Sequence, residues 1–378
     1  MDKELKEGQN TGIIEAGPPS GGWVDGGETG AALVVLEESG QFDLYLPEEE
    51  SQFQLVDRAT FDTQGCVTES GTNDIETLIT RLRTKGLLPA THEAFLKNGG
   101  YINPQSGKVN FSDRFTAKMS GTTRAGNYLG AVWESMRDLH GLLPESDLPF
   151  PDMSDLPGPE NEATRWERYY ADISQAHQAK AKKFLDYFKI TYQWILVGTP
   201  DNTKLRAYMK YGPMQIAAMV CMPWSSTEGA PPIPACGCGE GHATLVYGSR
   251  EDLAIKDFDS YKGYRKLLAP DYCIRYAVQG YLEVKNIVPS TEFHYVFNTN
   301  LRFGAGATAE VHKLQEALQY LKRADGSPYM KVGLFGPFGP ATKAALGKFQ
   351  TDRNIPDPDG QGTNFGPKTR TALNLLVK

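Results

Sequence analysis

The sequence lacks several features that would assign it to common classes of protein. Its 378 residues contain no basic stripe and carry a formal net charge of -7, so nucleic acid is not an expected partner. Even its longest apolar runs, such as residues 216–224, are too short to span a membrane. Residues 1–12 have neither an apolar core nor a small-residue cleavage site, so we do not expect them to form a secretory signal.

Cysteine and cofactor motifs are scarce as well. Five cysteines are an odd number and lie far apart, which does not suit a disulfide framework and is typical of a protein made in a reducing cytoplasm. Cys236 and Cys238 flank one glycine, but a zinc site needs a second set of ligands that the sequence does not offer. Residues 357–360 match only the start of a calcium loop. No His-Glu-x-x-His, phosphate-loop or dinucleotide motif occurs, so we expect no metal and no cofactor.

The chain is too long for one typical domain, so two domains are expected. Residues 1–52 are rich in Gly, Pro and acidic residues, which predicts an extended arm with one strand at Ala32–Leu36. Residues 53–297 form the main predicted domain. A Gly/Ala-rich linker at residues 298–308 separates it from a helical domain at residues 309–378.

Hydrophobic patterns predict the elements of the main domain. Helices are expected at Cys66–Lys85, Gly126–Leu139 and Glu162–Phe188. Apolar or alternating runs between Gly and Pro residues predict the strands Pro213–Val220, Thr244–Val246, Ala254–Phe258, Tyr272–Val278 and Tyr281–Val284. Helices first and strands later indicate an α+β fold.

A cysteine stands at the start of the first predicted helix, in the stretch DTQGCVTESGTNDIE. Unpaired N–H groups and the macrodipole at a helix N-terminus favour a thiolate and can bind an oxyanion. Cys66 is therefore a candidate nucleophile. Free cysteines are more often inert core residues, so the position also fits a small buried side chain.

A nucleophilic thiol needs a base beside it and a group that orients the base. His242 lies at the start of the apolar segment GHATLVYG, and Asp259 lies at the end of the next one. Two neighbouring strands would place the imidazole beside the carboxylate, which would fix the tautomer of the ring. Taken singly, His242 also fits the start of an ordinary strand, and Asp259 an ordinary turn.

These segments resemble the papain-like cysteine peptidases. Similar blocks are the active-site helix at residues 66–76, with Ser70, Ile75 and Glu76 in register, the Gly-Pro strand at Gly212-Pro213, the histidine segment at 241–248, and residues 255–261, where Asp259 and Tyr261 replace the family's Asn and Trp. The resemblance implies a two-lobed domain, with a helical lobe followed by an antiparallel β lobe. It also implies catalysis by Cys66, His242 and Asp259.

One position departs from the family pattern. The family carries a glutamine six residues before its cysteine, where it donates to the oxyanion, but this sequence has Thr60 there. Gln64 is closer to the cysteine and Gln54 farther away, and we take Gln64 as the candidate donor. Loss of one such donor costs about 10²–10³ in rate, so the activity depends on a replacement.

The last region contains an internal repeat. Phe338-Gly-Pro-Ala-Thr342 and Phe365-Gly-Pro-Lys-Thr369 each place proline near the first turn of a predicted helix, where its missing N–H costs nothing. Together with the helix VHKLQEALQYL, these elements predict a three-helix bundle and resemble the peptidoglycan-binding module of cell-wall hydrolases. The repeated residues also fit a purely structural role inside the bundle.

These features together predict a papain-like cysteine peptidase domain joined to a wall-binding bundle. The resemblance makes peptide bonds of bacterial peptidoglycan the expected substrate, and a phage lysis or virion protein made without a signal the expected context. Two alternatives stay open. The domain is catalytically weak or inactive and serves as a binding or structural component, or it is a peptidase that cleaves proteins during maturation.

Overall fold

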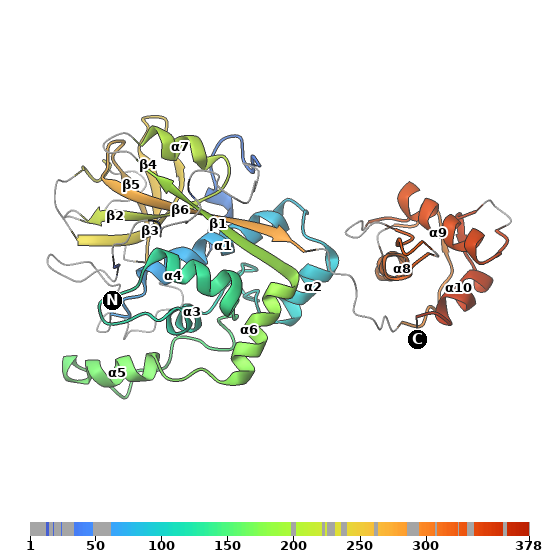
Figure 1. The fold of residues 1–378 in the computed structure, drawn as a ribbon, viewed down its shortest axis with the longest axis horizontal. Coiled ribbons are helices and arrows are strands. Elements are labelled where there is room, and N and C mark those ends of the chain that lie inside the picture. Colours follow the sequence, from blue (N-terminus) through green and yellow to red (C-terminus); the bar gives the residue numbers. More distant parts are fainter. Residues whose placement is uncertain are drawn as a thin grey trace. The chain divides into compact units, whose positions relative to one another are not determined.

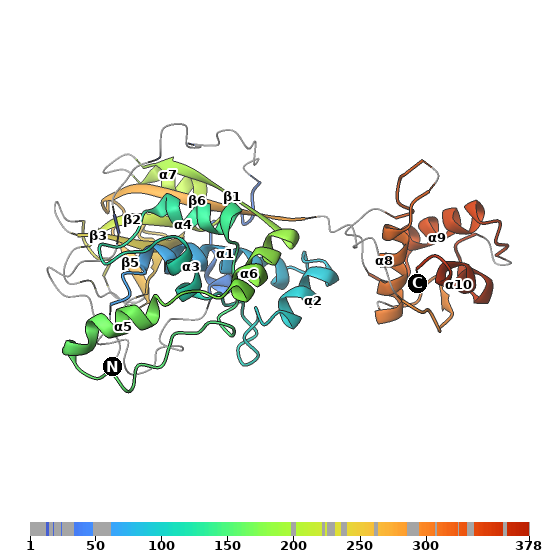
Figure 2. The same cartoon turned by 60° about the horizontal axis from the view of Figure 1, so that its bottom comes forward.

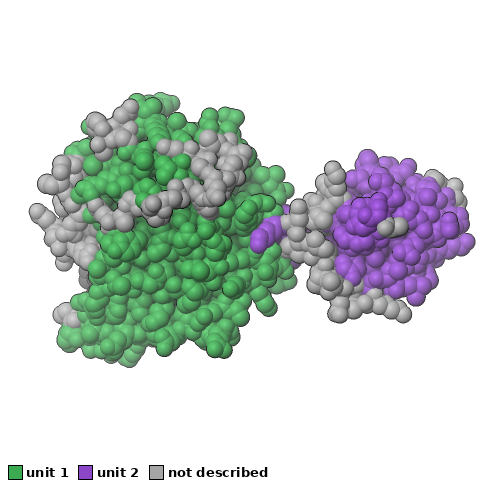
Figure 3. Space-filling view, in the orientation of Figure 1, with its two compact units in different colours: residues 1–87, 95–284 green, residues 88–94, 285–378 purple. Residues whose placement is uncertain are grey.

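The computed structural model describes residues 13–14, 18, 24, 34–47, 62–197, 202–220, 224, 231–235, 240–260, 264–285, 295–306, 308–323, 325–330, 336–357 and 361–377. The chain divides into two compact units (Figure 3). The first comprises residues 1–87 and 95–284, and the second comprises residues 88–94 and 285–378.

The first unit begins with helices. They are α1 (Cys66–Thr84), α2 (Ala90–Asn98), α3 (Asp113–Met119), α4 (Leu129–Glu134) with a π-helical continuation η4 (Ser135–Leu139), α5 (Glu162–Tyr169) and α6 (Gln175–Tyr187), with 3-10 turns η1 (Asp43–Tyr45) and η5 (Pro159–Asn161). Residues 90–94 of α2 belong to the second unit, and the rest of this helix belongs to the first. The helix α1 is central, because every residue from Cys66 to Arg81 is buried. Some of its hydroxyl groups donate within the helix: Ser70 donates to the carbonyl of Cys66 at 2.6 Å, and Thr77 donates to that of Asn73 at 2.7 Å.

A six-stranded antiparallel sheet follows, in the order β1-β6-β2-β3-β4-β5 (Figure 1). Its strands are β1 (Phe188–Leu196), β2 (Met214–Val220), β3 (Glu240–Ser249), β4 (Ile255–Phe258), β5 (Arg265–Leu268) and β6 (Ile274–Val284). In the sequence, α7 (Thr203–Met209) comes between β1 and β2. The α+β prediction, with helices before an antiparallel sheet, is confirmed.

Successive residues of β2 attach the sheet to helices on its two faces. Gln215 donates to the carbonyl of Val67 at 2.6 Å and to the hydroxyl of Ser70 at 2.7 Å, so it holds α1. The side-chain oxygen Oε1 of Gln215 accepts from the indole N–H of Trp133 in α4 at 2.8 Å. The next residue, Ile216, packs in an apolar cluster with Met209 of α7. Because successive side chains of a strand point to opposite faces, α1 and α4 cover one face and α7 the other.

Two expectations about elements are wrong. The single helix expected at Glu162–Phe188 is two helices, α5 and α6 (Figure 2). Ser174 accepts from the backbone N–H of His177 and caps α6, and the strand β1 begins at Phe188. The two strands expected at residues 272–284 are one strand, β6. Gly280 does not break it, since a Cβ there would lie 2.5 Å from the ring of Trp133: the glycine permits close packing rather than a turn.

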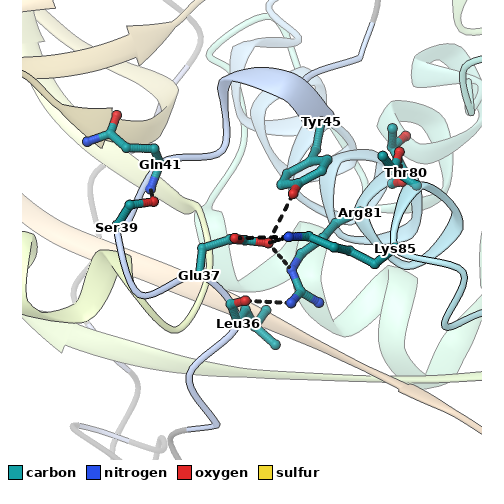
Figure 4. A network of polar contacts seen from close by, with 9 residues as sticks. Leu36, Glu37, Ser39, Gln41, Tyr45, Thr80, Arg81 and Lys85 are labelled. Atoms are coloured by element: carbon teal, nitrogen blue, oxygen red, sulfur yellow. Dashed lines mark hydrogen bonds and ion pairs between the residues drawn. The ribbon is translucent and has the colours of Figure 1, made fainter.

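Residues 34–47 lie against the C-terminal half of α1 (Figure 4). Glu37 accepts from Nε of Arg81 at 2.9 Å and from the hydroxyl of Tyr45 at 3.1 Å, and Lys85 forms an ion pair with it at 3.3 Å. Arg81 also donates to the carbonyl of Leu36. The strand expected at Ala32–Leu36 is absent over residues 34–36, and its first two residues lie outside the described part of the chain.

The second unit contains α8 (Ala309–Tyr320), α9 (Pro340–Asp352) and α10 (Pro367–Asn374), together with a short pair of strands, β7 (Leu301–Arg302) and β8 (Asn364–Phe365). The three predicted helices are thus present, and Pro340 and Pro367 each occupy the first helical position. Phe297 and Leu301 pack into the core of this unit, although the sequence assigned them to the first domain and the linker.

The second unit contains two similar clamps. In each, a buried glutamine binds the loop ahead of the next helix and a threonine in the first turn of that helix. Gln315 donates to the carbonyl of Gly336 at 3.1 Å and to the hydroxyl of Thr342 at 2.9 Å. Gln350 donates to the carbonyl of Asn364 at 2.7 Å and to the hydroxyl of Thr369 at 3.1 Å. Because the two clamps have the same geometry, we infer that these repeat residues stabilise the bundle.

Candidate active site

Cys66 is the first residue of the central helix α1, as the sequence predicted. A tight turn leads into it: the backbone N–H of Gln64 donates to Asp62 at 2.9 Å, and that of Gly65 donates to the hydroxyl of Thr63 at 3.3 Å. The hydroxyl of Tyr170 donates to the carbonyl of Thr63 at 2.6 Å and fixes the turn from the other side. The first N–H groups of a helix have no intrahelical acceptor, so they point toward the region where an oxyanion would form at this sulfur.

His242 brings the two halves of the unit together. It lies in β3, paired in register with Ala218 of β2, and its side chain is fully buried. One side of the ring shares a hydrogen bond with the thiol of Cys66. Its Nε2 lies 2.8 Å from Oδ1 of Asp259. The three predicted residues therefore form one continuous chain of sulfur, imidazole and carboxylate.

Asp259 follows directly after β4, and backbone geometry fixes its place. Its N–H donates to the carbonyl of Tyr264 at 2.7 Å, which closes the connection between β4 and β5. Because β3 and β4 are adjacent and antiparallel, the residue after the end of β4 lies near the start of β3. The sequence expectation that neighbouring strands present an imidazole and a carboxylate side by side matches this arrangement.

Charges within this chain shift both titrating partners. Burial lowers the pKa of His242, but the negative charges of Asp259 and Cys66 outweigh burial and raise that pKa well above its usual 6.5. Burial raises the pKa of Asp259, but the positive charges of Lys266 and His242 outweigh it and hold that pKa far below 3.8. The site therefore favours an ionised carboxylate beside a protonated imidazole.

Two further side chains contact Asp259 that sequence reasoning did not select. The indole of Trp224 donates to Oδ2 at 2.5 Å, and Nζ of Lys266 lies 2.9 Å from the same oxygen. The Trp224 ring also packs edge-on against His242, with 6.0 Å between centroids. Neither residue carries a motif. The one local signal is a lysine in β5, a strand whose neighbouring residues Leu267 and Leu268 are buried.

The reactive groups are covered. Cys66 is only 4% exposed, and His242 is fully buried. A substrate carbonyl can therefore reach the sulfur only after some of the covering groups move.

Gln64, the candidate oxyanion donor, is half-buried two residues before Cys66 and has a φ of 55°. This left-handed conformation is uncommon for a residue other than glycine, and such conformations cluster at functional turns. The other two positions weighed for this role, Thr60 and Gln54, lie outside the described residues. The role of Gln64 stays a prediction.

Among the described residues, no group of three or more His, Cys, Asp or Glu side chains could hold a metal ion. Cys236, Cys238 and Asp359 lie outside the described part of the chain. In the part that the structure describes, every helix is too short or too polar to cross a membrane.

Comparison with known proteins gives the following findings. No protein-family model and no curated protein matches the chain. Solved structures with a similar backbone include the proform of the ragweed pollen cysteine protease Amb a 11, with 13% identity, a TM-score of 0.35 and coverage of 57% of this chain and 59% of that one. The chain thus spans less than two thirds of that relative's length. Others are the bromelain protease of Ananas comosus (10% identity, TM-score 0.38, 64% and 98% coverage) and digestive procathepsin L 3 of Tenebrio molitor (13%, 0.32, 66% and 77%).

Proposed function

We propose that this chain is a cysteine peptidase in which Cys66 is the nucleophile, His242 the acid and base, and Asp259 the group that orients the imidazole. One observation carries the proposal: the buried chain of sulfur, imidazole and carboxylate at the start of a helix. Those are the parts that a thiol nucleophile needs, namely a favoured thiolate, an adjacent base and a group that fixes the base.

The reaction follows from the geometry. The thiolate of Cys66 attacks the peptide carbonyl carbon and forms a C–S bond, and the carbonyl oxygen becomes an oxyanion near the N-terminus of α1. The C–N bond then breaks as the imidazolium of His242 gives its proton to the leaving amine. A water molecule next attacks the thioester and gives a proton to His242, which releases the carboxylic acid product and restores the thiolate–imidazolium pair.

The backbone N–H of Cys66 is the first proposed donor to the oxyanion. Gln64 is the proposed second donor, since it precedes the nucleophile by two residues in a fixed turn. Its replacement by alanine is expected to lower kcat by about 10²–10³ with little change in thiol labelling. Equal kcat in the variant and the parent protein would remove Gln64 from this role.

Labelling of the thiol tests the proposal without a known substrate. Wild type, Cys66→Ala and Cys273→Ala are treated with a thiol-directed peptidase inhibitor, and the labelled peptide is located by mass spectrometry. Cys273 is a half-buried free cysteine of the same unit and serves as the matched control. We expect labelling at Cys66 that persists in Cys273→Ala. In His242→Gln the rate of labelling at Cys66 should fall by about 10²–10⁴-fold. Equal labelling of wild type and His242→Gln would contradict the proposed catalytic pair.

Bacterial peptidoglycan is the proposed substrate, and the second unit is the proposed wall-binding module. Support comes from the resemblance of its repeated Phe-Gly-Pro-x-Thr elements to peptidoglycan-binding modules. The clamp residues are buried and already bonded within the bundle, so other side chains of this unit would have to contact the wall. The proposed place of action is the cell wall, or a phage particle that meets it.

Purified sacculi test the substrate. Wild type and Cys66→Ala are incubated with sacculi, bound protein is measured by sedimentation, and newly freed amines are identified. We expect both proteins to sediment and only the wild type to release amines. Sedimentation without amine release, from a wild type whose Cys66 does not label, would favour an inactive, adhesive protein. Two observations support this adhesive alternative: the low exposure of Cys66, and a threonine at position 60 in place of the family's glutamine. Cleavage of a protein but not of sacculi would favour a maturation peptidase.

A further inference from the structure

Two buried ionisable side chains next to the proposed site take no part in the reaction described above. Lys266 is 1% exposed and Asp257 is fully buried, and the two are partners in the register of β4 and β5. Removing a charge from water costs several kcal/mol unless good partners compensate for it. A lysine in this position therefore needs a physical reason.

The contacts of Lys266 give that reason. The two oxygens of Asp259 are divided between partners: Oδ1 faces Nε2 of His242 at 2.8 Å, whereas Oδ2 accepts from Trp224 at 2.5 Å and pairs with Lys266 at 2.9 Å. The ammonium also lies 5.8 Å from the centroid of the Trp224 ring. Lys266 thus binds the carboxylate from the side away from the imidazole.

This placement matters because the proton on His242 must leave during the reaction. A carboxylate with its full charge next to the imidazole stabilises the imidazolium and holds the proton that the leaving amine requires. An ammonium bonded to the other carboxylate oxygen offsets that charge. The pair of Asp259 and Lys266 then orients the ring as a neutral unit.

We propose that Lys266 is a positioning residue that neutralises Asp259 and so keeps His242 able to release its proton. Its meaning for the reaction rests on the proposed peptidase function, but its effect on His242 can be measured without a substrate. Among the described residues, Cys66 from α1, Asp257 from β4 and Asp259 after β4 interact electrostatically with His242, and Lys266 from β5 pairs with Asp259. Lys266 is the cation of this set.

The test is a titration of the His242 ring by NMR in the full chain. Lys266→Met keeps the volume of the side chain and removes its charge, and Lys266→Arg keeps the charge. We expect Lys266→Met to raise the pKa of His242 by on the order of one pH unit, because Asp259 loses the cation that pairs with it at 2.9 Å and a nearby charge shifts a pKa by about 1–3 units. Lys266→Arg should leave that pKa close to the parent value. An unchanged or lowered value in Lys266→Met overturns the proposal.

A second pair of variants covers the case in which Lys266→Met does not fold. Asp259→Asn removes the carboxylate that pairs with Lys266 and keeps the ammonium, whereas the double variant Asp259→Asn with Lys266→Met removes both charges. The pKa of His242 should be lower in the single variant than in the double variant, because only the single variant keeps the ammonium nearby. Equal values would overturn the proposal.

Activity separates this inference from the proposed function. If the pKa of His242 responds as expected but the wild type neither labels at Cys66 nor cleaves peptides, the peptidase function fails and the charge effect remains. If the wild type cleaves peptides and the pKa does not respond, the inference alone fails. Where both hold, the alkaline limb of Cys66 alkylation should move to higher pH in Lys266→Met, in step with the shift of His242.

Discussion

Asp257 allows a quantitative test of the buried charges. Its side chain is fully buried, and desolvation together with the charge of Asp259 raises its pKa from 3.8 to about 7. The folded state keeps a proton that the unfolded state has released, so the free energy of unfolding falls as pH rises through this interval. Since one pH unit corresponds to about 1.4 kcal/mol, the ionised carboxyl destabilises the fold by about 4 kcal/mol above pH 7. About 3 kcal/mol of this change falls between pH 5 and pH 8.

Replacement by asparagine keeps the shape of Asp257 and removes this titration. Asp257→Asn should therefore be more stable than the wild type at pH 8, and its free energy of unfolding should fall by about 3 kcal/mol less between pH 5 and pH 8. Urea denaturation followed by tryptophan fluorescence measures this change in the first unit, because all five tryptophans lie within residues 1–284. Asp271→Asn, at an exposed aspartate, is the control. The same pH dependence in Asp257→Asn and the wild type would refute the reasoning.

Three further substitutions test single contacts. Trp224→Phe keeps the ring but removes the donor to the carboxylate, and urea denaturation should show a loss of about 1.5–3 kcal/mol. Gly141 has a φ of 72°, and a Cβ at this position would lie 2.3 Å from the carbonyl oxygen of Ala181. Gly141→Ala should therefore lower the free energy of unfolding by at least about 2 kcal/mol in the same assay. Gln350→Ala removes one clamp, and hydrogen exchange of the Gly362 amide, which donates to Gln350, should become on the order of 100-fold faster. An unchanged value in any of these assays contradicts the role given to that contact.

The parts of the site that the sequence predicted are those with local signals. Cys66 follows a turn and opens a helix whose periodicity is plain, and His242 and Asp259 lie at the start and just after the end of adjacent apolar strands. Each position follows from neighbouring residues alone. That these positions meet in space follows only from the order of the strands in the sheet.

The parts that the sequence did not predict depend on contacts between distant segments. Lys266 and Trp224 lie 7 and 35 residues from the aspartate they bind, and neither stands in a pattern that marks a ligand. Gly280 suggested a turn because glycine usually interrupts a strand, yet here it makes room for Trp133, which lies 147 residues earlier. The break between α5 and α6 had a local signal in Ser174, but the helical composition on both sides concealed it.

The two clamps of the second unit raise a question of fidelity during folding. Both join a glutamine to a threonine, but Gln315 reaches Thr342 across 27 residues and Gln350 reaches Thr369 across 19. The two threonines offer the same hydrogen-bonding group, so side-chain chemistry cannot determine which glutamine pairs with which threonine. The length of chain between the partners has to determine the pairing. An insertion that evened out the two spans would therefore promote mispaired or exchanged segments between molecules, even if it left every bond of the native bundle intact.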